Sequence, residues 1–258
     1  MPEFQHTIAN PWHAIAGNAP PYALQQDLSD IESFNATADA KHRIQLDVFP
    51  EPFIGDPAAP ILILSLNPGF KPAQVEAHAQ PELARLLVKS LRLEAGGESV
   101  PFHHLHPTYQ KHSPSVWWPR CLKGWIERFG LERVSRSFFC VEFFPYASRT
   151  YKALPGLLES QRFGFAVARD KIAAGATVIA FRHKRVWMKQ LSDCDAEQWI
   201  TPVNLFPVSQ RWCKQALNPP PQFSRSHARP LPGDGETDDA SDSVRPLGRR
   251  RVRGARSA

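Results

Sequence analysis

Apolar residues follow two different patterns along the first 224 residues of the chain. Three short runs are apolar at nearly every position, over residues 61–66, 138–144 and 177–181. Between these runs lie longer segments in which apolar residues recur every three or four positions. Continuous apolar runs are typical of strands buried on both faces, as in parallel sheets covered by helices. The pattern therefore predicts one α/β domain over residues 1–224, with a mainly parallel central sheet.

Helical periodicity marks the segments between the runs. In residues 81–93 four leucines fall on one helical face, and Pro81 suits the first helical turn. In residues 116–130 apolar side chains recur with helical spacing, and Gly130 suits the C-terminal cap. The proline-punctuated residues 47–60 and the histidine-containing residues 101–115 are expected to be loops. Helices are expected over residues 24–34, 81–93, 116–130, 163–176, 184–191 and 210–217, and a last strand over residues 199–209.

The ends of the predicted strands indicate where a site would lie. In an open parallel sheet, ligands bind beyond the carboxyl ends of the strands. Asn67, Pro145 and Arg182 each follow the end of a predicted strand. We therefore expect these three residues at one rim of the sheet.

Composition changes the picture only toward the C-terminal end. From Arg225 the sequence has almost no large apolar residues, eight arginines and five acidic residues. We expect residues 225–258 to form a disordered tail rich in Arg, Pro and Gly. It is either a nucleic-acid-binding arm or a solvated tail without a specific role. The tail carries +3 of the chain's net charge of +6, so the remainder is mildly basic and compatible with a phosphate-bearing partner.

Several classes of protein are disfavoured. No run of 18 uncharged apolar residues occurs, and the first residues lack the pattern of a secretory signal, so we expect a cytoplasmic protein without a membrane partner. The four cysteines are widely spaced without a CxxC pair, which favours reduced structural thiols, and Cys140 within a predicted strand is expected to be inert. Nucleotide-binding glycine-rich loops and the GxSxG motif of serine hydrolases are also missing.

The first strand ends in a motif with two readings. In "ILILSLNPGF", residues 61–70, an Asn-Pro-Gly turn follows the apolar run directly. On spacing alone this is an ordinary turn, because Pro fixes φ and Gly tolerates positive φ. "SLNPGF" also resembles the first motif of the uracil-DNA glycosylase superfamily, in the branch with Gly-(Ile or Met)-Asn-Pro-Gly. The resemblance implies that Asn67 positions the hydrolytic water, that Ser65, Pro68 and Gly69 shape the pocket, and that Phe70 stacks on a base.

The second run ends in a weaker match. The single-strand-selective members of that superfamily have an Asn at the end of a mid-chain strand, where its amide reads the edge of uracil. In "FFCVEFFPYASR" the corresponding residue is Glu142. An ionised carboxylate only accepts hydrogen bonds, whereas an amide both donates and accepts. We therefore expect Glu142 either to read a base with more donors or to serve as a general base; a structural ion pair with Arg149 or Arg182 is the equal alternative.

The late His-Pro-Ser motif of the superfamily has no counterpart here. Arg182, His183 and Lys184, after the third predicted strand, are candidates to contact phosphate or to stabilise a leaving anion. A solvated basic turn is the alternative interpretation. The histidines of residues 103–112 do not match a known metal-ligand spacing and have no acid nearby in the sequence. We therefore expect no metal and no cofactor.

Together these features predict a three-layer α/β/α sandwich similar to the uracil-DNA glycosylases. The expected function is metal-independent hydrolysis of the N-glycosidic bond of a damaged or deaminated base in DNA. Two alternatives stay open: a catalytically inactive nucleic-acid- or nucleotide-binding protein with the same fold, and a nucleoside or nucleotide hydrolase. We expect DNA as the partner, no obligate protein partner, and a monomer.

Overall fold

The computed structural model describes residues 8–15, 19–110, 117–181, 183–196 and 199–201. The chain divides into two units, residues 1–219 and 220–258, and every described residue belongs to the first. The expected tail, the expected helix over 210–217 and most of the expected last strand lie outside the described residues. Within that last segment, Ile200 forms an isolated parallel bridge with Ile179.

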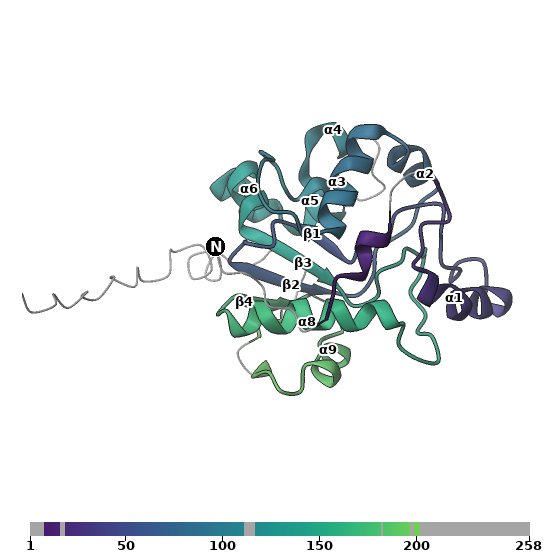
Figure 1. Ribbon diagram of the computed structural model, residues 1–258. Helices are drawn as coiled ribbons and strands as arrows, with labels where there is room; N and C mark the ends of the chain where they lie inside the picture. Colours follow the sequence, from purple (N-terminus) through teal and green to yellow (C-terminus); the bar gives the residue numbers. More distant parts are fainter. Residues whose placement is uncertain (1–7, 16–18, 111–116, 182, 197–198, 202–258) are drawn as a thin grey trace, which may run out of the picture. The chain divides into compact units, whose positions relative to one another are not determined.

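A four-stranded mixed sheet forms the centre of the first unit (Figure 1). Its strands are β1 (Phe53–Gly55), β2 (Ile61–Ser65), β3 (Phe138–Glu142) and β4 (Thr177–Ala180), in the order β1-β3-β2-β4. Strand β2 pairs in parallel with both β3 and β4, while β1 runs antiparallel to β3. The α/β class is thus confirmed, and the three apolar runs form the three parallel strands.

Helices flank the sheet and match most of the periodic segments. None of those described is long and apolar enough to cross a membrane. Helices α2 and α7 were not anticipated, and the single helix expected over residues 116–130 is divided into α5 and α6. Short helices also interrupt the loop expected over residues 101–115. The helices are α1 (Gln25–Thr37), α2 (Ala73–His78), α3 (Pro81–Leu91), α4 (Pro107–Gln110), α5 (Trp117–Cys121), α6 (Lys123–Phe129), α7 (Leu131–Ser137), α8 (Glu159–Ala173) and α9 (Lys184–Gln190), with 3₁₀ turns η1 (Pro11–Ala14) and η2 (His103–Leu105).

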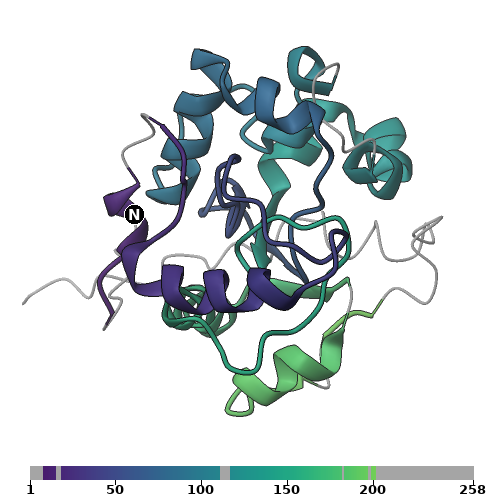
Figure 2. The ribbon, with the colours of Figure 1, turned by 90° about the vertical axis from the view of Figure 1, so that its right-hand side faces the viewer.

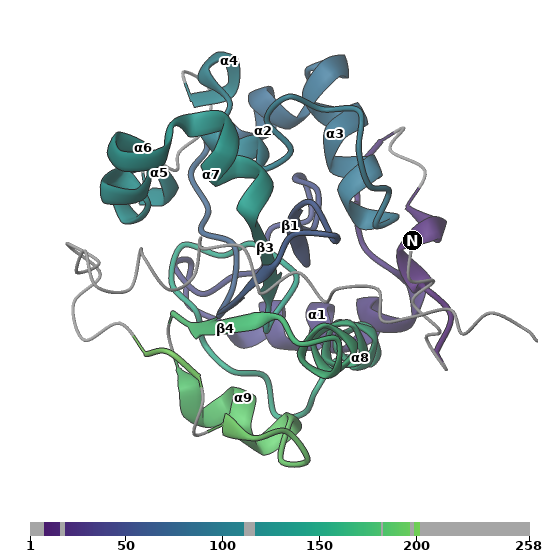
Figure 3. The same ribbon diagram turned by 90° about the vertical axis from the view of Figure 1, so that its left-hand side faces the viewer.

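The two faces of the sheet are buried against different helices (Figures 1 and 3). Because side chains alternate along a strand, Ile61 and Ile63 point to the face covered by α5, α6 and α7. Leu62 and Leu64 point to the opposite face, which α8 covers. Helix α1 lies beside α8 (Figure 2), where buried Asp27 accepts a hydrogen bond from the Ser160 amide at 3.2 Å. This double cover explains why the strands read as continuous apolar runs.

The prediction of a loop over residues 47–60 is wrong at Phe53–Gly55, because these residues form the edge strand β1. A strand of three residues is too short to give a period-2 signal, and it forms because β3 offers an unpaired edge. Gly55 has φ of +97°, and a Cβ there would lie 2.4 Å from the Phe138 carbonyl oxygen. The close approach of the two strands therefore requires glycine at this position.

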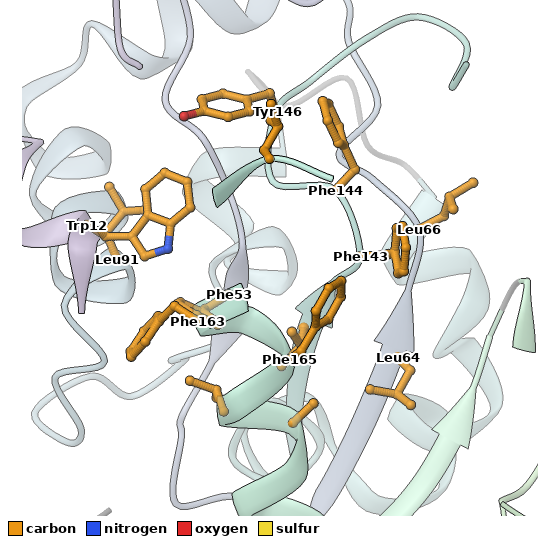
Figure 4. Close-up of a cluster of buried hydrophobic side chains, with 14 of the residues drawn as sticks. Trp12, Phe53, Leu64, Leu66, Leu91, Phe143, Phe144, Tyr146, Phe163 and Phe165 are labelled. Atoms are coloured by element: carbon orange, nitrogen blue, oxygen red, sulfur yellow. The ribbon is translucent and has the colours of Figure 1, made fainter. Parts of the chain in front are cut away.

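An aromatic cluster holds the segment that follows β3 (Figure 4). Phe143 packs against Phe165 of α8, and Phe144 against Tyr146. The Tyr146 hydroxyl donates to the Asp27 carboxylate at 2.7 Å and accepts from the Leu24 amide at 3.1 Å. The turn after β3 is thus anchored to both α1 and α8, which fixes the residues around the carboxyl end of the strand.

Candidate functional site

A pocket of about 630 Å³ opens at the carboxyl ends of β2 and β3. After β2 the chain first forms α2 and α3, whose buried side chains pack in the same cluster as those of α8, and then α5–α7 on the opposite face of the sheet. Strands β2 and β3 are parallel, so their carboxyl ends meet at one rim of the sheet, and this is the usual ligand position in open α/β sheets. The pocket volume lies in the range of small-molecule sites.

Asn67 is held rigidly at the edge of this pocket. Its Nδ2 donates to the Pro68 carbonyl oxygen at 2.9 Å and to the Ser148 hydroxyl at 3.1 Å. Since the Pro68 carbonyl can only accept, the side chain must present its NH₂ group to it. Oδ1 accepts no hydrogen bond from the described residues, so the amide offers the pocket an acceptor.

Backbone hydrogen bonds fix the turn that carries Asn67. The Phe70 amide donates to the Ser148 carbonyl oxygen at 3.1 Å, and the Ser148 amide donates to the Pro68 carbonyl oxygen at 3.3 Å. The Asn-Pro-Gly turn is therefore tied to the segment after β3. A turn on the free surface would lack such hydrogen bonds. The pairing of the turn with the segment after β3 therefore fixes the position of the Asn67 side chain.

Ser65 and Glu142 are register partners at the ends of β2 and β3. Both are buried and both line the pocket, with Glu142 5% exposed. The backbone of Ser65 is fixed because its carbonyl oxygen accepts from Trp187 Nε1 at 2.7 Å and from the Phe143 amide at 3.2 Å. The Glu142 amide donates to the Pro52 carbonyl oxygen at 2.9 Å. A carboxyl group thus lies in the floor of the pocket beside a hydroxyl.

A second buried acid enters the pocket from a segment that the sequence did not single out. Glu51 precedes β1 and is 2% exposed. Its Oε2 lies 3.0 Å from His103 Nε2 and 2.7 Å from His104 Nε2, and its Oε1 lies 3.8 Å from His78 Nε2. Glu51 and His104 both line the pocket. No acidic residue lies near His103 and His104 in the sequence, but the fold brings Glu51, about fifty positions earlier, into contact with both.

Burial and neighbouring charges shift the ionisation of this cluster. Burial raises the pKa of Glu51, but the adjacent His104 and His103 outweigh it and hold that pKa well below its usual range. Burial lowers the pKa of His78 to about 4 and also lowers the pKa of His103. At neutral pH Glu51 is a carboxylate beside neutral His78 and His103 imidazoles.

Cations and aromatic rings surround the mouth of the pocket. Lys71, Arg120, Arg149 and His183 line it and are exposed. His183 has φ of +54°, a left-handed conformation immediately before α9. The half-buried rings of Phe70, Trp117 and Tyr151 line the pocket as well. An acidic floor under a rim of cations suits a ligand with a hydrogen-bonding head and a phosphate backbone.

The structure brings most of the expected site residues together. Those that line the pocket are Ser65, Asn67, Pro68, Gly69, Phe70, Glu142 and His183. Lys184 does not line it, and Arg182 lies outside the described residues.

Four further residues in or near the pocket were not among the expected site residues. Trp118 is buried in the core and also lines the pocket. Cys140 is fully buried, and burial raises the pKa of its thiol, in agreement with an inert thiol. Glu51 and His104 were missed because no local spacing connects them.

Comparison with protein-family models, with curated proteins and with solved structures gave no match for this chain.

Proposed function

We propose that the protein is a DNA N-glycosylase that hydrolyses the glycosidic bond of a damaged or deaminated base. One observation carries the proposal: Asn67 is locked at the pocket with only its carbonyl oxygen left to accept. An acceptor held in this way can orient a water molecule by taking one of its protons in a hydrogen bond. The resemblance of "SLNPGF" to the glycosylase motif points the same way.

The pocket offers a role for each group in such a reaction. The target nucleotide is turned out of the stack, because the enzyme cannot reach the bond within a duplex. Phe70 stacks on the extruded base, and Asn67 Oδ1 aims the oxygen of water at the anomeric carbon of the sugar. As the carbon–nitrogen bond breaks, its electron pair leaves with the base. The oxygen of water bonds to the anomeric carbon, and the proton that this water gives up is finally taken by the departing base. Glu142 reads the edge of the base or accepts the proton of the attacking water.

The fold and charges are compatible with this proposal. Helices on both faces of the sheet correspond to the α/β/α layers that the glycosylase resemblance implies. Exposed Lys71, Arg120 and Arg149 are suited to contact the phosphates on both sides of an extruded nucleotide. His183 adds a donor at the same rim.

A base-release assay tests the proposal. The full chain is incubated with oligonucleotides containing uracil, hypoxanthine, xanthine or other lesions, and abasic sites are cleaved with alkali. We expect release from at least one lesion and a change of lesion preference in Glu142→Gln, because the amide can donate where the carboxylate cannot. Ser137→Ala, which alters a serine of α7 outside the pocket, is the control and should release as the wild type does.

The same assay separates the alternatives. Binding of DNA without release of any base would favour an inactive binding protein, for which the Glu in place of Asn and the missing His-Pro-Ser motif argue. Release from free nucleosides alone would favour a nucleoside hydrolase. Either result would contradict the proposed DNA glycosylase.

A further inference from the structure

We infer that Glu51, His103 and His104 form a binding site for a divalent first-row transition metal ion in the wall of the pocket. The inference concerns a different group of residues from Asn67 and Glu142 and does not rest on the proposed function. One carboxylate oxygen and two imidazole nitrogens lie within 4.8 Å of one another, and all three side chains are buried.

The ligand set is chemically specific. Two imidazoles with one carboxylate hold zinc in catalytic sites, and they also hold iron(II) in sites with open positions. Neighbours on a 3₁₀ turn are about 120° apart around the axis, so adjacent side chains on such a turn usually diverge. His103 and His104 are adjacent on η2, yet both direct Nε2 to the same oxygen of Glu51. Packing alone does not require this convergence.

The distances between the three ligand atoms fit a site that widens slightly when a metal ion binds. Metal bonds of about 2.0–2.1 Å at tetrahedral angles place neighbouring ligand atoms about 3.3 Å apart. The nitrogen–oxygen distances of 3.0 and 2.7 Å are a few tenths of an ångström shorter. A small rotation of the Glu51 side chain therefore makes room for an ion, and the hydrogen bonds to the carboxylate are replaced by bonds to the metal.

The residues around Glu51 also suit the binding of a cation. His78 Nδ1 accepts from the Phe49 amide at 3.0 Å, which leaves the proton on Nε2, 3.8 Å from Glu51 Oε1. A third histidine thus lies beside Glu51 Oε1, and this buried oxygen accepts no hydrogen bond from the described residues. Among the described residues, no lysine or arginine forms an ion pair with Glu51. A divalent ion would compensate this buried negative charge.

The site also has an entrance. Glu51 and His104 line the pocket, whereas His103 does not. The side of the cluster formed by Glu51 and His104 therefore faces the pocket. An ion held there would keep a coordination position for water or for an oxygen of a bound ligand, as catalytic rather than structural sites do.

Titration of the metal-free full chain, purified without a polyhistidine tag, tests the inference. We expect one equivalent of Zn²⁺ to bind, and millimolar Mg²⁺ not to compete, because Mg²⁺ prefers oxygen ligands in octahedral geometry. Co²⁺ should give visible absorption bands of a tetrahedral site without thiolate charge transfer. Glu51→Gln and His104→Gln should each weaken Zn²⁺ binding at least about 100-fold.

His106→Gln is the matched control, because His106 lies on the same segment but outside the cluster. The affinity of this variant for Zn²⁺ should equal that of the wild type.

Failure of the wild-type chain to bind one equivalent of Zn²⁺, or Zn²⁺ binding that survives in a folded Glu51→Gln variant, would overturn the inference. So would a thiolate band in the Co²⁺ spectrum, which would place the ion on a cysteine; this readout does not depend on the variants folding. Base release by a protein that binds no metal would contradict only this inference.

Discussion

The orientation of a single amide decides what Asn67 can do. The Pro68 carbonyl and the Ser148 hydroxyl both accept from Nδ2, so the two hydrogen bonds fix which end of the amide is the NH₂ group and leave Oδ1 as the acceptor. An aspartate at this position would present an oxygen to the Pro68 carbonyl and be repelled by it. The Asn-Pro-Gly sequence thus specifies more than a turn: it specifies a directed acceptor.

Ser148→Ala is expected to slow base release about fivefold while the protein stays folded. The substitution removes one of the two acceptors that hold the Asn67 amide, and one such hydrogen bond contributes about 1 kcal/mol. Single-turnover base release measures the effect. Ser137→Ala removes a comparable hydrogen bond, from its hydroxyl to the Arg133 carbonyl, away from the pocket and should leave the rate unchanged. Equal rates in all three proteins would show that Ser148 does not position Asn67.

The lowered pKa of buried His78 predicts that the free energy of unfolding falls in mild acid. Burial lowers the pKa of His78 to about 4 from 6.5, so the unfolded chain takes up this proton first as the pH falls. The contribution of His78 is therefore fully present above pH 6.5 and is lost between about 6.5 and 4, by roughly 3 kcal/mol. Urea unfolding in the presence of EDTA measures it across this range. His78→Gln keeps the acceptor for Phe49 and should show a shallower pH dependence; an unchanged slope would contradict the assignment.

At the scale of elements, the site follows from how the strands are paired. Strands β2 and β3 are adjacent and parallel, so their carboxyl ends lie at the same rim of the sheet. The crevice between their ends collects Asn67 from one strand and Glu142 from the other. The segment before β1 contributes a third side, because Glu51 lies two positions before the strand begins. A strand of three residues therefore completes the pocket.

Gly55→Ala is expected to destabilise the protein by at least about 2 kcal/mol, because the new methyl group would meet the Phe138 carbonyl and the backbone is at positive φ. Gly124→Ala in α6 is the control. A Cβ at Gly124 meets nothing within 4 Å, so the stability should be unchanged or slightly raised. Chemical denaturation of both variants measures the difference. Similar stabilities would mean that β1 does not pair with β3 as described.

At the scale of the whole molecule, periodicity predicted the parallel strands and the main helices. These elements could be predicted because each has a local signal, such as the continuous run of β2 or the leucine face of α3. The pairing of β1 could not be predicted, since it depends on the free edge of β3. The Asn67 and Glu142 positions were predictable because strand ends gather at one rim.

The cluster around Glu51 could not be found in the same way. Glu51 stands between two prolines in a segment without periodicity, and His103 and His104 lie in a separate irregular segment. Their meeting is a property of the tertiary structure, and no spacing in the sequence encodes it. The pair of adjacent histidines was the one available signal.

DNA binding is expected to weaken steeply with salt, through the cations at the mouth of the pocket. Replacing Arg120 or Arg149 by Gln should lower the slope of log affinity against log salt concentration by about 1 for each phosphate that the side chain no longer neutralises. Fluorescence anisotropy with a labelled oligonucleotide measures the slope. Arg162→Gln is the control, because Arg162 lies on α8 and pairs with Glu159 at 3.0 Å. An equal decrease of the slope in the control would show that general charge, and not this rim, binds DNA.

The most direct test of the central claim is single-turnover release of a base by the wild type and by Asn67→Ala. The proposed role of the amide predicts release from a lesion-containing oligonucleotide by the wild type and a fall of at least about 100-fold in the variant. DNA affinity should stay the same, since the amide acts on the water and not on the phosphates. Absence of release from every lesion, or equal rates in the two proteins, would contradict the claim.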